Sequence, residues 1–561
     1  MTDGIVPLIV GVTGHRDLVE SEKPDLEQAL EAFFTELKTS FADLPILLLT
    51  GIAEGADSLA ADVAHRCGCD VQLVLPMPEE TYEADFEGAA LERFKSYCQK
   101  FPKKELPILP GEGGDGFERE RQYALLGSFL AAHSHILLAI WDGKYNSATG
   151  GTSQVVEFHQ TDITLDDPES QRSRLDIRDD ESDLVHHIVC SRGSSGPPVE
   201  GLTPTESFWY TRDDKKPRVK QLPSRYQMVF ERMQDFNREL LRRPNQRSPY
   251  DLEPADLSEH AREKTDAIRA VYLASDGLAS FYQRRVMLSL RGTIVAALLA
   301  GLSFILYADF ADQSGMIWFY LAFALIAIGG YMVADRFDWQ RRYLDYRVLA
   351  EGLRVQFYWA LAGVEMSNAN RYSHDSIFQG RDLQLGWIRN VMRFTGLRAD
   401  LAESLGQTER ALAIASWVGD QDSGQVGYYR KKSSVMIGQH RRTQMLIASC
   451  FGLGIMSALI LASGFTSGVV ENLFIALMGL FPILAAARQN YAHRMAEREL
   501  VAQYAYMRDV YENAHRLIEA SDNEQEALRI LRDLGESALN ENAQWVLRQR
   551  ERPLPGGDAM S

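Results

Sequence analysis

Residues able to bind an anionic ligand gather in three glycine-rich segments of the N-terminal half. The segments are Gly11-Val12-Thr13-Gly14-His15-Arg16-Asp17, Thr50-Gly51-Ile52-Ala53-Glu54-Gly55-Ala56-Asp57, and Trp141-Asp142-Gly143 followed by Gly150-Gly151-Thr152. A glycine-rich turn that opens a helix exposes backbone N–H groups at the positive end of the helix dipole, which suits a phosphate or another anion. Three such turns together predict a site for a nucleotide-type ligand.

Each turn follows a short apolar run that predicts a β-strand. The runs are 5–12, 45–50, 71–76, 135–141 and 185–190, with helical patterns such as 25–41 and 56–66 between them. Apolar strands that alternate with helices indicate a parallel, doubly wound α/β sheet buried on both faces. In such sheets ligands bind outside the carboxyl ends of the strands. The expected ligand-binding residues are therefore Gly11, Thr13, Gly14, His15, Arg16, Gly51, Glu54, Gly55, Ala56, Asp57, Asp142, Gly143, Gly150, Gly151 and Thr152.

Two of these residues have more than one interpretation. Glu54 could act as a general acid or base, or it could be a solvated carboxylate of the turn. His15, next to Arg16, could contact an anion or could stabilise the turn.

The same segments resemble the SLOG superfamily, which includes the LOG proteins, the DNA-processing DprA fold and a domain fused to TRPM-type channels. Four motifs occur in order, and the similarity covers about residues 5–210. They are GVTGHRD (11–17), TGIAEGADSLAADVA (50–64), RERQYALLGSFLAAHSHILLAIWDG (119–143) and GGTSQVV (150–156). The resemblance implies a Rossmann-like fold that binds a nucleotide or a nucleotide-derived ligand.

The chain departs from the phosphoribohydrolase members of that superfamily at one motif. They carry PGGxGTxxE, with a catalytic Glu three residues after the Thr. Here Val155 stands three residues after Thr152, no proline precedes the glycines, and Glu157 is out of register. We therefore predict no catalytic residue and no enzymatic activity. A membrane-anchored nucleotide or NAD hydrolase that uses Glu54 or Glu157 remains the alternative.

Four apolar segments in two close pairs indicate a membrane protein, since each approaches the ~20 residues that cross a bilayer. They are 287–307 with 316–333, and 445–465 with 469–487. Arginines and lysines flank both pairs, whereas the loops within the pairs carry none. The positive-inside rule then places both termini in the cytoplasm, with the chain in the inner membrane. Two buried helix pairs in a soluble domain are the alternative.

The 561 residues predict several domains. The fold class expected is an α/β Rossmann-like doubly wound domain followed by an all-α membrane domain with four transmembrane helices in two hairpins. The boundaries expected are a ligand-binding domain at 1–215 with an acidic loop at 161–183, a helical connector at 216–286, a first hairpin and helix at 287–365, a cytoplasmic segment at 366–442, a second hairpin and helix at 443–520, and a tail at 521–561.

Composition narrows the function classes further. A net charge of -18 argues against a general nucleic-acid binder, because phosphate backbones need a positive surface. The five cysteines lack paired zinc spacing, so no metal is expected, and no cofactor beyond the nucleotide-derived ligand. No chain of ionisable residues crosses the apolar segments, which weighs against a proton-coupled transporter.

The C-terminal half contains a possible internal repeat of helix, membrane hairpin and long helix. In the register that we predict, Leu353 aligns with Leu500. Residues 274–285, 345–359 and 417–432 resemble the SLATT effector domains, over about 270–520 in all. That resemblance implies an effector that forms homo-oligomers and permeabilises the lipid bilayer, in bacterial antiphage defence. A ligand-gated ion channel outside defence and a scaffold with a degenerate site are the other candidates.

Overall fold

The computed structural model describes residues 4–108, 118–145, 149–161, 184–211, 218–309, 315–364, 385–400, 405–521 and 523–550. The chain folds into two compact units. The first holds Met1–Asn245, Glu259–Val271 and Glu365–Ser404, and the second holds Gln246–Ser258, Tyr272–Val364 and Leu405–Ser561. Most of the predicted acidic loop, the centre of the loop at 308–315, and the C-terminal end from 551 lie outside the described residues.

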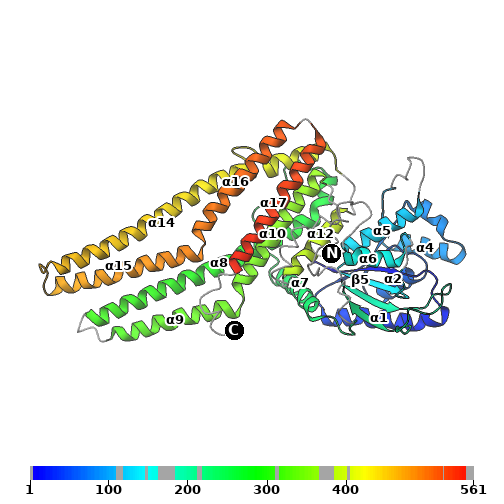
Figure 1. Cartoon of the computed structure of the whole chain (residues 1–561), viewed down its shortest axis with the longest axis horizontal. Coiled ribbons are helices and arrows are strands. Elements are labelled where there is room, and N and C mark those ends of the chain that lie inside the picture. Colours follow the sequence, from blue (N-terminus) through cyan, green and yellow to red (C-terminus); the bar gives the residue numbers. More distant parts are fainter. Residues whose placement is uncertain are drawn as a thin grey trace. The chain divides into compact units, whose positions relative to one another are not determined.

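A seven-stranded sheet forms the centre of the first unit, in the order β4-β3-β2-β1-β5-β6-β7. Figure 1 shows the sheet among its helices. All neighbouring strands are parallel except β6 and β7, which are antiparallel. The strands are β1 Leu8–Gly14, β2 Ile46–Thr50, β3 Asp70–Leu75, β4 Lys103–Glu105, β5 Ile136–Trp141, β6 Val185–Val189 and β7 Ser207–Tyr210. The prediction of a mostly parallel sheet is confirmed, although the two edge strands β4 and β7 were not predicted.

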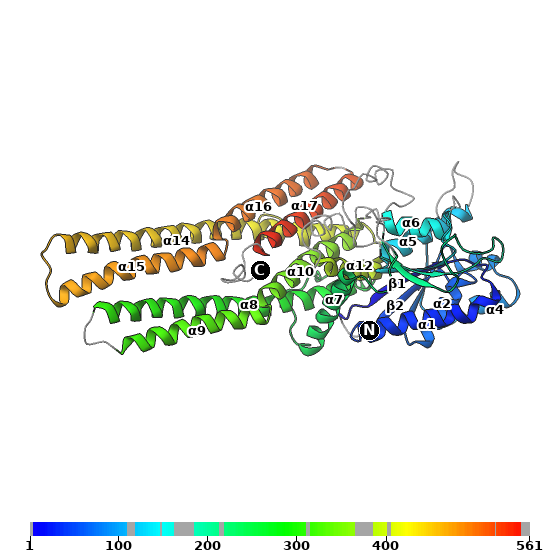
Figure 2. The same cartoon turned by 60° about the horizontal axis from the view of Figure 1, so that its bottom comes forward.

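Helices cover this sheet, and every residue of β2, β5 and β6 is buried, as continuous apolar strands require. The helix α1 lies on the opposite side of the sheet from α5 and α6 (Figure 2). The helices of this unit are α1 Lys23–Ser40, α2 Ala56–Arg66, α3 Glu79–Tyr82, α4 Gly88–Lys100, α5 Arg119–His133, α6 Thr152–Thr161, α7 Ser224–Arg242 and α12 Gly386–Asp400.

The helix α12 belongs to the sheet unit although it follows the first two apolar segments in sequence. Its Arg393 Nη1 donates to the Ser134 carbonyl at 2.9 Å, just before β5. The neighbouring His135 ring bridges two backbones, with Nδ1 3.1 Å from Ile9 N and Nε2 2.9 Å from Asn390 O. Burial lowers the pKa of His135 to about 3, so this ring is a neutral structural link. The chain therefore returns to the sheet between its two pairs of apolar helices.

The second unit is helical. Its elements are most of α8 Glu259–Asp309, then α9 Met316–Arg336, α10 Trp339–Ala362, α13 Gln407–Ala413, a π-helical turn at Ile414–Val418, α14 Gly424–Ala462, α15 Val469–Arg494, α16 Glu497–Ala520 and α17 Glu524–Arg550. Four helical stretches are long and apolar enough to cross a membrane. The expectation of a helical C-terminal half with four such segments is thus confirmed. The helix α8 runs without a break through residues 286 and 287.

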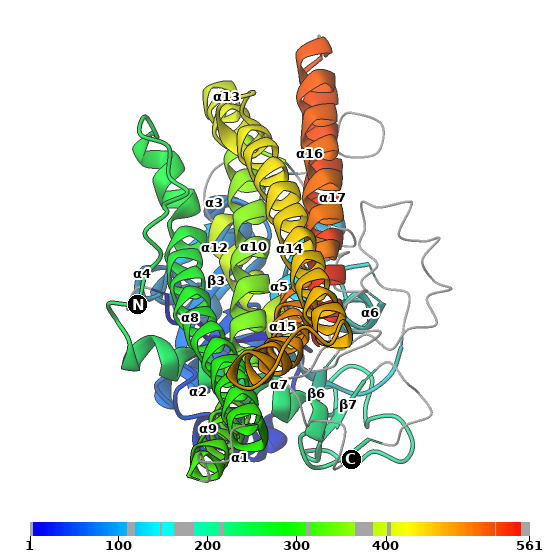
Figure 3. The same ribbon diagram turned by 90° about the vertical axis from the view of Figure 1, so that its left-hand side faces the viewer.

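The four apolar helices lie side by side in the order α9, α8, α15, α14 (Figure 3). The Ser289 hydroxyl of α8 donates to the Gly330 carbonyl of α9 at 3.3 Å. Between α8 and α15, a Cβ built on Gly479 would lie 3.3 Å from Ile305 Cδ1. Between α15 and α14, a Cβ on Gly454 would lie 3.3 Å from Pro482 Cδ. Small residues thus allow the close approach of these helices.

An internal repeat is visible where each pair ends. A single left-handed residue joins α9 to α10 and α15 to α16: Asp338 has φ 51° and ψ 33°, and Ala496 has φ 51° and ψ 36°. Each is followed by a helix of 24 residues. Because Arg342 N bonds to Asp338 O as Leu500 N bonds to Ala496 O, Leu500 corresponds to Arg342. The predicted alignment of Leu353 with Leu500 is therefore wrong, since amphipathic helices match in several registers.

Candidate functional site

The turns after β1 and β5 meet at the carboxyl edge of the sheet. The His15 ring Nε2 lies 3.1 Å from the Asp142 backbone nitrogen and 3.1 Å from the Asp142 carboxylate. Burial lowers the pKa of His15, and the carboxylate of Asp142 only partly opposes this shift. The ring is therefore neutral at pH 7 and can accept the Asp142 N–H. Of the two interpretations of His15, these contacts favour the structural one.

The turn after β2 packs tightly on the turn after β1. Gly55 has φ 90°, and a Cβ there would collide with the carbonyls of His15 and Arg16. The Ala56 N–H donates to the His15 carbonyl at 3.0 Å, at the start of α2. Ile52 has φ 54°, a left-handed conformation that a β-branched residue rarely adopts. This combination indicates a turn whose shape is held by its surroundings.

The third glycine turn contacts α5. Gly150 has φ 74°, and a Cβ on it would lie 2.6 Å from Tyr123 Cβ. The Gly150 N–H donates to the Gln154 side chain at 2.6 Å, so this amide is already satisfied. Gly151 accepts from Gln154 N at 3.0 Å in the first turn of α6. The start of α6 offers helix-terminal amides.

A group of aromatic and charged side chains connects these turns, and of these side chains the sequence predicted only Arg16. The exposed Arg16 guanidinium lies 4.8 Å from the centre of the Tyr123 ring, a cation–π distance. The Tyr123 hydroxyl donates to the Asp85 carboxylate, which also receives a hydrogen bond from Arg119. Tyr82 donates to the Gly51 carbonyl at 3.3 Å. The edge of the sheet thus presents an arginine on an aromatic wall, an arrangement that suits an anionic group next to a planar ring.

Asp57 is the most unusual titratable group of this edge. Its side chain is buried, with 7% exposure, in the first turn of α2. Burial raises the pKa of Asp57 to about 7, although Arg16 and a hydrogen bond from the Ala53 backbone oppose the shift. A buried carboxyl that titrates near pH 7 is typical of functional sites.

Val155, three residues after Thr152, is part of the packed core of the sheet unit. It is 4% exposed and belongs to a core cluster with Leu137 and Trp141. A Cβ on Gly127 of α5 would lie 2.6 Å from Val155 Cγ2, so the contact between α5 and α6 depends on both residues. Glu157 and Glu54 are both exposed.

Most of the predicted residues therefore come together. Those that follow β1, β2 and β5 lie on loops that contact one another, and the turn before α6 reaches the same group through Tyr123. Gly11, Thr13 and Gly14 lie within β1, and a Cβ on Gly11 would collide with Ser134. A glycine at position 11 is therefore required by packing against Ser134 and not by a ligand at the edge of the sheet. Within the described parts of the chain, no cluster of His, Cys, Asp and Glu could bind a metal.

No family model, no curated protein and no solved structure matches this chain.

Proposed function

We propose that this chain is a membrane-embedded effector in which the sheet unit senses a nucleotide-derived ligand and the apolar helices deliver the response. The observation that carries the proposal is the convergence of the glycine turns around Arg16, in a chain with four membrane-length helices. The sheet is taken as a Rossmann-like SLOG domain. The strand order supports this, because β2 and β5 leave β1 in opposite directions, and such a switch point is where open sheets bind ligands.

In this proposal the ligand lies over the carboxyl ends of β1 and β5. Arg16 is exposed and carries a positive charge beside an aromatic ring, so it would bind the phosphate while Tyr123 contacts a base or sugar. The helix-terminal amides at Gly151 and Thr152 would add donors. No residue is assigned a catalytic role, because Val155 occupies the position of the catalytic Glu.

The membrane output is proposed to be a pore or a local disruption of the bilayer, formed by several copies. The apolar stretch of α9 is 0% buried, and that of α14 is 11% buried. Such apolar surface is covered by lipid or by neighbouring copies. The basic flanks support an inner-membrane protein with two SLATT-like hairpins and cytoplasmic termini. An antiphage role rests on the family resemblance.

The helix α8 provides a physical connection for the signal. Its residues Glu259–Val271 belong to the sheet unit, and from Tyr272 onward it belongs to the helical unit. A ligand shifts such a system only if it binds two conformations of the sheet unit with different affinity.

A membrane-anchored nucleotide hydrolase is the second candidate, and Asp57 favours it. A carboxyl with a pKa of about 7 can donate or accept a proton at physiological pH. This candidate differs from the one that the sequence suggested, because Glu54 and Glu157 are exposed while Asp57 is buried.

Calorimetry and chromatography on the full chain in detergent separate the two candidates. The probes are ATP, NAD⁺, ADP-ribose and cyclic di-AMP. If the sheet unit is a sensor, we expect at least one probe to bind saturably and to form no product. Arg16→Ala should abolish this binding. Turnover that Asp57→Asn abolishes would favour the hydrolase instead. Arg66→Ala, an exposed arginine on the nearby α2, is the matched control.

A further inference from the structure

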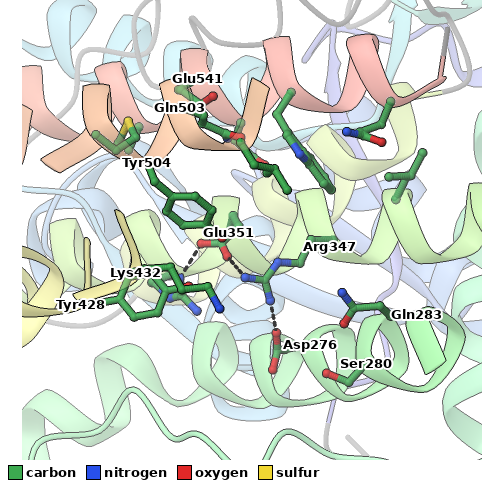
Figure 4. Close-up of a pocket in the computed structure, with 18 of the residues that line it drawn as sticks. Asp276, Ser280, Gln283, Arg347, Glu351, Tyr428, Lys432, Gln503, Tyr504 and Glu541 are labelled. Carbon is green, nitrogen blue, oxygen red and sulfur yellow. Dashed lines mark hydrogen bonds and ion pairs between the residues drawn. The ribbon is translucent and has the colours of Figure 1, made fainter. Parts of the chain in front are cut away.

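A cavity of about 820 Å³ lies inside the helical unit (Figure 4). Helices α8, α10, α14, α16 and α17 all contribute to its wall. Its size falls in the range of small-molecule sites. It belongs to a part of the chain that the proposed sensing site does not use.

The cavity separates the two copies of the internal repeat. One wall comes from α8 and α10 of the first copy, and the other from α14 and α16 of the second. Along α8 the lining runs from Tyr272 to Leu290, about 27 Å at the helical rise of 1.5 Å per residue. At that far end the lining residues Val286, Met287 and Leu290 include the start of the first apolar segment. The cavity therefore extends from the polar bundle to the edge of the expected bilayer.

Its polar wall on α8 and α10 is electrically balanced. Arg347 lies 2.8 Å from Asp276 and 2.5 Å from Glu351, and Glu351 lies 2.5 Å from Arg354. Burial alone would raise the pKa of Glu351, but Arg347 and Arg354 hold it below its usual value. Arg347, Glu351 and Arg354 keep 35, 25 and 20% of their side-chain surface exposed, and all three line the cavity. Two cations and two carboxylates thus cancel here.

The facing wall carries a positive charge without a protein counter-ion. Lys432 of α14 lines the cavity and is half-buried, and it forms no ion pair or hydrogen bond within the part of the chain that the structure describes. Figure 4 shows its side chain pointing into the cavity near Arg347 and Glu351. Glu541, on α17, is matched by Gln503 at 2.6 Å and by Arg548 at 3.5 Å. An ammonium enclosed in this way favours an anion of single charge.

Tyrosines supply the rest of the wall around Lys432. Tyr428 lies one turn before it on α14, and the Tyr428 and Tyr504 rings are 6.4 Å apart. Such side chains offer hydroxyl donors together with apolar faces, a combination found where polar and apolar surroundings meet.

We propose that this cavity binds an anionic phospholipid, with its phosphodiester at Lys432 and its acyl chains directed toward Val286, Met287 and Leu290. A phosphodiester carries one negative charge and would pair with the Lys432 ammonium, while Asp251 and Arg494, which also line the cavity, are of opposite sign. The occupant should be an amphiphile, because the cavity has a charged end at Lys432 and an apolar end at the start of the first apolar segment. A lipid in this position contacts both copies of the repeat, so it links the arrangement of the helical bundle to the bilayer. The proposal depends on the apolar helices lying in a membrane, but not on the sensing role of the sheet.

Native mass spectrometry of the delipidated full chain in detergent tests this assignment. The probe is dioctanoyl phosphatidylglycerol, and we expect Lys432→Met to weaken its binding at least tenfold. Lys431→Met, which changes the adjacent exposed lysine outside the cavity, should change it less than twofold. Tyr504→Leu should also weaken binding, whereas Tyr506→Leu, at a residue that is 55% exposed and outside the lining, should not.

Three further probes distinguish the possible occupants. Glycerol 3-phosphate has the phosphate without the chains, dioctanoylglycerol has the chains without the phosphate, and AMP pairs a phosphate with an aromatic ring. Each should bind at least tenfold more weakly than the phospholipid. Equal binding of any of them, or equal effects of the Lys431 and Lys432 variants, would overturn the proposal. Nucleotide binding at the sheet should persist in Lys432→Met, so failure of one proposal is distinguishable from failure of the other.

Discussion

Replacing Asp57 by Asn should stabilise the sheet unit more as the pH rises. The pKa of Asp57 is about 7 in the folded chain, against an ordinary value of 3.8, because the carboxyl is buried. Between these values the unfolded chain releases its proton while the folded chain retains it, so stability falls as the pH rises from about 4 to about 7. The difference between these two pKa values corresponds to a cost of at most about 4 kcal/mol above pH 7.

The Asn variant removes this cost and can still accept the hydrogen bond from Ala53. We expect the gain in stability of the variant at pH 8 to exceed its gain at pH 5 by at most about 3 kcal/mol. Peptide-resolved hydrogen exchange of the full chain, corrected for intrinsic rates, measures the opening free energy of β1, β2 and α2 alone. Glu54→Gln, which changes an exposed carboxylate three residues earlier, is the control. A gain in Asp57→Asn that does not depend on pH, or a loss at every pH, would refute the argument.

Three other substitutions test the packing. Val155→Glu places an unpaired charge in the core and should cost several kcal/mol, seen as a lower thermal midpoint, without creating hydrolase activity. Gly454→Leu should force α14 away from Pro482 and lower the midpoint in detergent, whereas Gly452→Leu, with open space around it, should not. Arg347→Met leaves Asp276 without its cation and leaves Glu351 paired with Arg354 alone, so it should destabilise the helical unit by about 1–3 kcal/mol, a range reduced because these groups are partly exposed. An unchanged free energy of unfolding would contradict this role of the ion pairs.

The central strands were predictable because each is a continuous apolar run buried on both faces. The run at 45–50 became β2 Ile46–Thr50, and the helix at 56–66 was predicted to the residue. β4 was not predictable, since Lys103–Glu105 is a short polar edge strand with no apolar signal. The packing of α12 on the sheet unit was also not predictable from local sequence, because contacts such as that of Arg393 with Ser134 join residues far apart in the chain.

In the candidate site too, features set by local sequence could be predicted and features set by long-range packing could not. Glycine turns after strands can be predicted locally, and those after β1, β2 and β5 do meet. The stacking of Arg16 on Tyr123 depends on how α5 crosses the edge of the sheet, and so does the burial of Asp57. A local signal existed for Val155, whose apolar character in the helical pattern already indicated a core position. The cavity around Lys432 depends on five helices, so no local pattern could indicate it.

Dye release from liposomes that contain the full chain tests whether a nucleotide makes this protein permeabilise a membrane. The protein is reconstituted with an entrapped fluorophore and exposed to ATP, NAD⁺, ADP-ribose or cyclic di-AMP. We expect that at least one of these nucleotides triggers release, that Arg16→Ala abolishes it, and that Arg66→Ala leaves it intact. Release by none of the four, or equal release from Arg16→Ala and the unsubstituted chain, would contradict it.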